Sequence, residues 1–296
     1  METPENLEHA DAEHAVAEGA PTRPTTEGAA AVVGRDLVLA WDGSTALGRS
    51  SFTIPAGSRT ALIGPNGSGK STLLHAISGL LAPSSGTLQV NVAGPRHRAI
   101  AYVLQATTVN DTMPVTVRET VLMGRFAHLG MFTPASRDDR RRCRDAMERL
   151  RIADLRDRHL DELSGGQRQR VFIAQGLVQE ADILLLDEPI TGLDLVSKDI
   201  IEEVLREERE RGATVVVSTH DLPEAADADH VLLLGGQVVA SGPPPQVLTA
   251  ALLTRAYGIP LTTLENGAVV LDDPHHVPAQ TRHVHYDRTG HADHPE

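Results

Sequence analysis

One stretch decides the fold of this chain: Gly64-Pro65-Asn66-Gly67-Ser68-Gly69-Lys70-Ser71-Thr72. A short apolar run, residues 60–63, precedes it, and a helix-like segment, residues 71–78, follows it. A strand, a glycine-rich loop and a helix in this order are the usual setting of a phosphate-binding loop. The glycines let successive backbone N–H groups turn toward an anion, and the dipole of the following helix adds to the attraction. The stretch therefore predicts an α/β fold built around a nucleotide-phosphate site.

Two side chains of this loop carry further chemistry. Lys70 is expected to reach the β- and γ-phosphates of a bound nucleotide. The Ser71 hydroxyl is expected to ligate the Mg²⁺ that accompanies them. We expect every residue of the loop to contribute to the ATP site: Gly64, Pro65, Asn66, Gly67, Ser68, Gly69, Lys70, Ser71 and Thr72.

A second acidic signal lies downstream of the loop. Residues 183–186 are a continuous apolar run, typical of a strand that is covered on both faces, and Asp187 and Glu188 follow directly. In a phosphate-loop fold a neighbouring strand delivers an acid to the metal, so Asp187 is the expected Mg²⁺ partner. Glu188 is then placed to polarise the water that attacks the γ-phosphate, as a general base.

The sequence Leu163-Ser164-Gly165-Gly166-Gln167 identifies the family that the chain resembles. With the phosphate loop before it and ILLLDEP after it, the chain resembles the ATP-binding-cassette ATPases, whose signature is LSGGQ. The resemblance covers roughly residues 32–257. It implies a head-to-tail dimer in which Ser164, Gly165, Gly166 and Gln167 meet the γ-phosphate that is held by a second copy of the chain.

Other positions match the pattern of this family one by one. Gln105 stands at the glutamine that senses Mg²⁺ and the attacking water, so the resemblance adds it to Ser71 and Asp187 as a metal contact. His220 matches the histidine that contacts the γ-phosphate, and Asp194 matches the loop that crosses the dimer interface. Trp41 stands at the aromatic position that stacks on adenine, and its π-face suits that role. The catalytic set that the resemblance implies is Glu188, His220, Gln105 and Lys70.

The fold predicted from these signals is an α/β cassette with a mixed central sheet, an antiparallel β subdomain and a helical signature subdomain. Strands are expected at 35–41, 51–54, 86–92, 99–104 and 214–217, helices at 117–123, 137–150 and 195–210, and a closing hairpin at 230–240. Residues 1–30 are predicted to be a disordered acidic tail. The cassette is expected over 31–260, with the helical subdomain at about 106–179, and a polar tail rich in histidine over 261–296.

Composition limits the function classes. The 27 basic and 40 acidic residues give a net charge of −13, which argues against sequence-independent nucleic-acid binding. No apolar run approaches the ~20 residues that span a bilayer, and the acidic N-terminus does not look like a cleavable signal. The single cysteine, Cys143, excludes an internal disulfide and suits a reducing cytosol.

Two charged segments have more than one interpretation. The arginine cluster of helix 137–150 is either a solvated face or a surface that docks on acidic headgroups or a membrane partner. The C-terminal histidines either bind a divalent cation or belong to a solvated low-complexity tail. They are residues 275, 276, 283, 285, 291 and 294.

A single cassette with a short helical insert favours the separate ATPase subunit of an importer. The implied partners are an integral-membrane permease and an extracytoplasmic metal-binding protein, and the expected location is the cytoplasmic face of the membrane. The pattern of residues 113–132 and 181–194 is similar to that of the zinc and manganese importers. ATPases of iron-chelate or cobalamin importers, and a soluble regulatory ATPase without a membrane partner, remain the alternatives.

Overall fold

The computed structural model describes residues 29–41, 43–104, 114–129 and 133–258, and the backbone of 262–263 and 269–270. The chain begins with an antiparallel sheet whose strand order is β2-β1-β4. Both strands of its first hairpin are longer than the sequence predicted, because pairing continues outward through Val32 and Ile54 to Ala30 and Pro55. The strands are β1 (Ala30–Trp41), β2 (Ser44–Pro55) and β4 (Ser85–Val90).

A second, six-stranded sheet has the order β5-β6-β7-β3-β8-β9. All neighbouring strands in it are parallel except β8 and β9, which form the predicted closing hairpin, so the sheet is mixed as expected. The expected strand at 99–104 starts one residue later, because Ala99 ends a short helix, α2 (Arg96–Ala99). The strands are β3 (Arg59–Ile63), β5 (Ile100–Val103), β6 (Ile183–Asp187), β7 (Thr214–Thr219), β8 (His230–Leu234) and β9 (Val238–Gly242).

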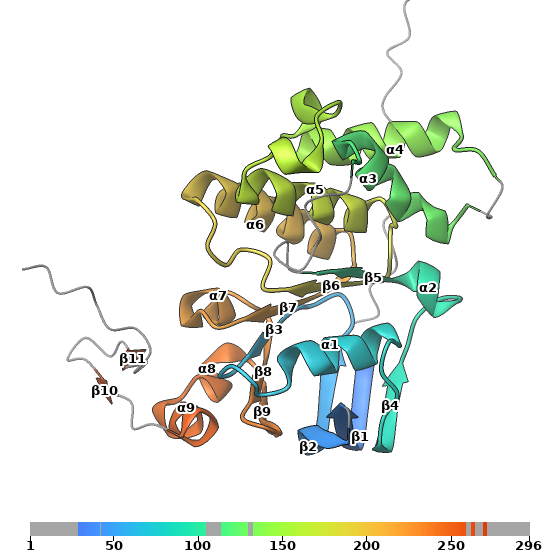
Figure 1. Cartoon of the computed structure of the whole chain (residues 1–296). Helices are drawn as coiled ribbons and strands as arrows, with labels where there is room; N and C mark the ends of the chain where they lie inside the picture. The colour runs from blue at the N-terminus through green and yellow to red at the C-terminus, as the bar shows by residue number, and fades with distance from the viewer. Residues whose placement is uncertain are drawn as a thin grey trace, which may run out of the picture.

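Helix α1 (Lys70–Ser78) lies between the two sheets (Figure 1). Its apolar side chains Leu73, Leu74 and Ile77 are fully buried in one cluster with residues of both sheets, Leu39 and Leu62 among them. Each such side chain contributes about 1.5–3 kcal/mol when it leaves water. The helix that follows the phosphate loop is therefore packed on both sides, which holds the loop against the central sheet.

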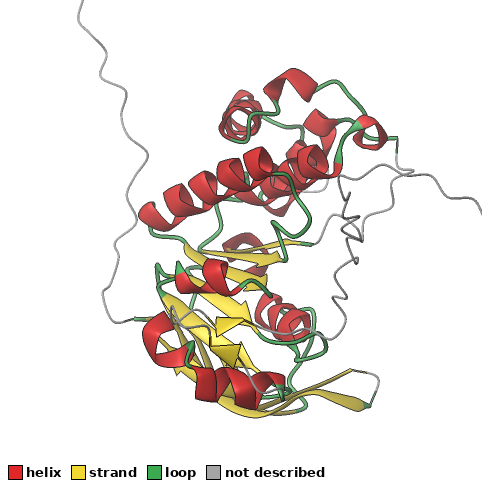
Figure 2. Cartoon of the chain, turned by 90° about the vertical axis from the view of Figure 1, so that its left-hand side faces the viewer, coloured by secondary structure: helices red, strands yellow, loops and turns green. Residues whose placement is uncertain are grey.

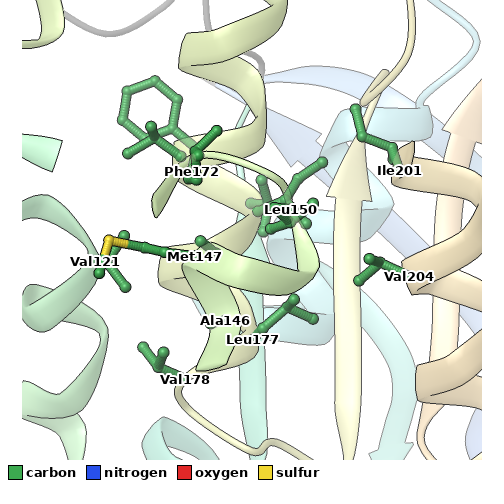
Figure 3. Packing of buried hydrophobic residues seen from close by; sticks show 14 of the residues in the cluster. Val121, Ala146, Met147, Leu150, Phe172, Leu177, Val178, Ile201 and Val204 are labelled. Carbon is green, nitrogen blue, oxygen red and sulfur yellow. The ribbon is translucent and has the colours of Figure 1, made fainter. Parts of the chain in front are cut away.

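A helical layer covers the other side of the central sheet, as Figures 1 and 2 show. Three of its helices begin at capping boxes, on Thr116, Ser136 and Ser164, which satisfy the first backbone N–H groups. In the close view of Figure 3, Met147, Leu150 and Ile201 belong to the apolar cluster that joins the four helices of this layer. The helices are α3 (Val117–Met123), α4 (Arg137–Arg149), α5 (Gly165–Leu177) and α6 (Leu195–Glu210).

The chain ends with short elements. The helices α7 (Leu222–Ala226), α8 (Pro244–Val247) and α9 (Ala250–Tyr257) pack near the β8–β9 hairpin. Beyond them, β10 (Thr262–Thr263) and β11 (Val269–Val270) form an antiparallel pair inside the segment that was expected to be only a polar tail. Within the described part of the chain, no helix combines the length and the apolar character that crossing a bilayer would need.

Candidate active site

The sheet order brings the motifs together at one edge. Strand β7 lies between β3 and β6, and all three are parallel, so their carboxyl ends meet at the same edge. In the register, Ile63 is paired with Thr219, and Asp187 with Ser218. The phosphate loop after β3, the two acids at the end of β6 and His220 after β7 therefore follow neighbouring strands, whose order can be followed in Figure 1. Crevices at the carboxyl ends of strands are where α/β folds bind ligands.

The loop after β3 has the geometry of an anion cradle. Among the described residues, the N–H groups of 69–72 find no acceptor, so they remain available at the start of α1. Gly64 has no room for a side chain, because a Cβ there would lie 2.2 Å from the Leu234 carbonyl oxygen. Gly67 instead faces open space with φ at 78°, a backbone conformation that glycine adopts without strain. The buried Ser68 hydroxyl also lacks a partner within the described residues, which suits a loop that closes around phosphate.

Lys70 is buried beneath this cradle. Its ammonium group donates to the carbonyl oxygens of Gly64 (2.8 Å) and Pro65 (3.1 Å), so the side chain turns back toward the first residues of the loop. Burial lowers the pKa of Lys70, while the charges of Glu188 and Asp187 act in the opposite direction. A phosphate group would be a better partner for this cation than two neutral carbonyls, so the lysine fits a phosphate ligand.

The two acids after β6 are held by one buried hydroxyl. Ser218 Oγ donates to Asp187 Oδ1 at 2.5 Å and accepts from the backbone N–H of Glu188 at 3.0 Å. Glu188 has a positive φ of 47°, a backbone conformation that residues other than glycine rarely adopt, and the hydrogen bond to the serine stabilises this turn. The second oxygen of Asp187 has only a long contact, 3.4 Å, with the Tyr102 hydroxyl. This carboxylate and the exposed Ser71 hydroxyl are the oxygen donors that the sequence predicted for Mg²⁺, and oxygen is the ligand type that this cation prefers.

His220 lies at the end of β7 and faces the second acid. Its Nδ1 is 3.8 Å from Glu188 Oε2, and its side chain is 55% exposed, whereas Glu188 is 21% exposed. The exposed imidazole and the more buried carboxylate thus lie side by side, and the charge of Glu188 acts on Lys70 of the phosphate loop. The structure thus brings together two of the side chains that were expected in the catalytic set.

Trp41 is the last residue of β1 and is 52% exposed. Its ring lies 5.7 Å from the imidazole of His75 on α1, with an angle of 34° between the planes. His75 in turn makes an edge contact of 5.5 Å with Tyr102, whose pKa is raised by burial and by Asp187. An exposed indole beside the helix of the phosphate loop is available to stack on a nucleobase.

The signature sequence forms the exposed start of α5. The Ser164 hydroxyl caps the helix by accepting a hydrogen bond from the Gln167 N–H at 3.3 Å, and the Gln167 side-chain oxygen accepts one from the Ser164 N–H at 3.0 Å. Gly165 faces open space, whereas a Cβ on Gly166 would lie 2.5 Å from Ser197 Oγ and 2.9 Å from Asp194 Oδ2. The Gly166 position therefore lets α5 approach the start of α6, which Asp194 caps through Ser197.

Not every predicted residue is found in the assembled site. Gln105 lies outside the described residues, so its role stays a prediction. The arginine cluster of α4 and the signature helix start belong to the helical layer.

Sequence reasoning missed Ser218 and Glu224. Ser218 could have been noticed as a polar residue directly after the apolar run 215–217, whereas nothing in the sequence around Glu224 marks it.

Comparisons with known proteins agree with this geometry. Residues 47–191 match the family model described as ABC transporter. The chain is 38% identical over 225 residues to the manganese transport system ATP-binding protein of Synechocystis sp., covering 74% of this chain and 86% of that protein. It is 41% identical over 226 residues to the zinc transport system ATP-binding protein of Treponema pallidum, covering 75% and 85%.

Two further proteins are similar. The Yersinia pestis protein named chelated iron transport system membrane protein is 38% identical over 237 residues, with coverage of 78% of this chain and 80% of that one. The solved structure of an ATP-binding cassette of an ABC transporter, in its ADP conformation, has a TM-score of 0.66 and 26% identity. The match covers 77% of this chain and 98% of the chain in the solved structure.

Proposed function

This chain belongs to the ATP-binding proteins of ABC transporters and is an ATPase of that family; on this premise we propose that it powers an importer of a transition-metal ion, Zn²⁺ or Mn²⁺. One observation carries the catalytic part of the proposal. The phosphate loop, the pair Asp187 and Glu188, and His220 converge at one edge of the central sheet. A site of this kind accelerates phosphoryl transfer by positioning and charge stabilisation.

Each residue of the edge has a proposed part in hydrolysis. Lys70 and the free N–H groups of 69–72 bind and orient the β- and γ-phosphates. Ser71 and Asp187 would hold Mg²⁺, which when bound neutralises charge on those phosphates, and Gln105 is proposed as a further contact. Glu188 Oε accepts a proton from the attacking water, and His220 binds the γ-phosphate beside it.

The active form is proposed to be a head-to-tail dimer of this chain. The start of α5 is an exposed helix N-terminus with open space at Gly165, and it lies in the helical layer rather than at the edge with the phosphate loop. Such a terminus binds anions, so it can complete the γ-phosphate site of a second copy. Trp41 is proposed to stack on the adenine at each site.

The cargo is proposed from the relatives. Those with about 40% identity are named for manganese, zinc and metal transport, and one is named for chelated iron. The proposed partners are accordingly an integral-membrane permease and an extracytoplasmic metal-binding protein, with this chain on the cytoplasmic face of the membrane. The iron-chelate importer is the second candidate, because the Yersinia pestis relative carries that description.

The cargo is tested in cells that lack this chain. They should grow poorly under chelation, and added zinc or manganese should repair the defect. Rescue by an iron chelate alone would move the assignment to the second candidate. A chain with Glu188→Gln should bind ATP, accumulate as a dimer on size exclusion and fail to restore growth.

The dimer is tested by mixing chains. Lys70→Ala and Ser164→Arg chains should each be inactive, and a mixture should regain activity because each mixed dimer keeps one intact site. Strictly linear dependence of the rate on protein concentration, with a proven monomer, would contradict the dimer.

A further inference from the structure

A buried carboxylate lies four residues beyond His220. Glu224 is on α7, and its side chain is only 6% exposed. It accepts a hydrogen bond of 2.6 Å from the hydroxyl of Thr219, and that same hydroxyl accepts one of 2.9 Å from the Asp221 N–H. These two bonds join the residues on either side of His220. The turn that presents the imidazole is therefore closed through the Thr219 hydroxyl and anchored on Glu224.

The surroundings of Glu224 do not explain its burial as an ion pair. Arg59 on β3 gives both of its terminal nitrogens to Glu202 on α6, at 2.6 and 2.8 Å. The Arg59 guanidinium is 4.0 Å from Glu224 Oε1, and that oxygen has no hydrogen-bond partner among the described residues. Burial raises the pKa of Glu224 to about 7, with Glu202 and Asp221 adding repulsion and Thr219 and Arg59 opposing it. Burying this carboxylate without a close cation lowers the stability of the fold, so its presence points to a role other than stability.

The same cluster touches three elements that lead to the active site. Arg59 opens β3, which ends at the phosphate loop, and Glu202 lies on α6, which starts at Asp194. Glu224 is the member of the cluster that contacts the turn carrying His220. Its surroundings therefore include the strand that leads to the phosphate loop and the helix that Asp194 caps.

We propose that Glu224 is a positioning residue, which holds the turn of Thr219, His220 and Asp221 so that the imidazole stays against Glu188 during hydrolysis. The proposal rests on the proposed function of His220. Among the residues that the structure describes, Glu224 contacts neither the phosphate loop nor Trp41, so its loss should lower kcat and leave nucleotide affinity unchanged.

The test uses the full chain and four variants. Glu224→Ala and Thr219→Val each remove one end of the bond, and each should lower kcat about tenfold, the effect of losing one hydrogen bond to a charged group. The KM for ATP should stay within about twofold, because the phosphate contacts are intact. Glu224→Gln keeps an acceptor oxygen and Thr219→Ser keeps the hydroxyl, so both should retain most of the wild-type kcat.

A double variant sharpens the result. Because both changes break the bond between Thr219 and Glu224, Glu224→Ala with Thr219→Val should be no slower than Thr219→Val alone, which also loses the bond from the Asp221 N–H. Asp227→Ala is the matched control, since Asp227 is an exposed acid at the end of the same helix, and it should leave kcat unchanged. Unfolding midpoints and the folded fraction are measured on every variant.

Several outcomes would overturn the positioning role. They are wild-type kcat in Glu224→Ala, multiplying losses in the double variant, failure of Thr219→Ser to retain activity, or a loss of kcat that only follows a loss of folded protein. The Glu188→Gln chain separates this failure from failure of the proposed function. If Glu188→Gln is inactive while Glu224→Ala is normal, only the positioning role is wrong. If Glu188→Gln still hydrolyses ATP, the catalytic assignment itself is wrong.

Discussion

Replacing Ser218 by alanine should damage stability and catalysis together. Ser218 is fully buried at the end of β7, and its hydroxyl bonds both acids of the site. It donates to Asp187 Oδ1 at 2.5 Å and accepts from the Glu188 N–H at 3.0 Å. Alanine removes both bonds and leaves a space of one oxygen atom, too small to admit water.

The size of the effect follows from those two bonds. A hydrogen bond to a charged group contributes about 1.5–3 kcal/mol. The Glu188 N–H, left without a partner, adds a desolvation cost of about 1–3 kcal/mol. The Glu188 backbone, with φ at 47°, loses its brace and can relax away from the left-handed region. We expect the free energy of unfolding to fall by about 3 kcal/mol and kcat to fall at least about tenfold.

Two assays measure these changes on the full chain. Urea denaturation gives the free energy of unfolding, and ATP hydrolysis at saturating Mg²⁺-ATP gives kcat. Thr60→Val is the matched control, because Thr60 is fully buried on neighbouring β3 and its hydroxyl, among the described residues, hydrogen-bonds only to the Ser58 hydroxyl, at 3.0 Å. That control should lose only about 1 kcal/mol and should keep its kcat.

The reasoning fails on either of two results. If Ser218→Ala costs no more stability than Thr60→Val, the short bond to Asp187 is not stabilising. If Ser218→Ala keeps the wild-type kcat in the folded fraction, the serine does not hold Glu188 for catalysis.

The other predictions concern four residues. Lys70→Ala should abolish measurable ATP binding in a nucleotide-binding titration, because it removes the buried cation beneath the cradle. Gly64→Ala should lower the unfolding midpoint, because its Cβ would meet the Leu234 carbonyl oxygen at 2.2 Å. Trp41→Ala should raise the KM for ATP roughly two- to tenfold and Trp41→Tyr should not, since only stacking is lost. Folding raises the pKa of Glu224 from 4.5 to about 7, so the stability that its protonated form contributes is complete below pH 4.5. Relative to Glu224→Gln, the free energy of unfolding of the wild-type chain should fall by about 3 kcal/mol as the pH rises to 7, measured by urea melts across that range.

Local chemistry made much of this protein readable from its sequence. The helix expected at 117–123 is found as α3, which starts at Val117 after the cap Thr116, because capping depends only on residues within one turn. The apolar run before Asp187 predicted β6, since a strand covered on both faces needs apolar side chains throughout. The glycines of the phosphate loop predicted its conformation in the same way, as Gly67 and Gly69 adopt positive φ angles. The resemblance to a family then assigned His220 and Trp41, which local chemistry alone did not.

The tertiary structure decided what these pieces do together. Periodicity predicts that a strand is buried but not which strand lies beside it, and the placement of β7 between β3 and β6 is what joins the phosphate loop to Asp187 and His220. Ser218 and Glu224 acquire their parts only there. The partner of Ser218 is 31 residues away in the sequence, and Glu224 lies beside an arginine from β3. Such contacts depend on the packing of the whole sheet, because their loop-closure entropy is offset only when the surrounding core forms.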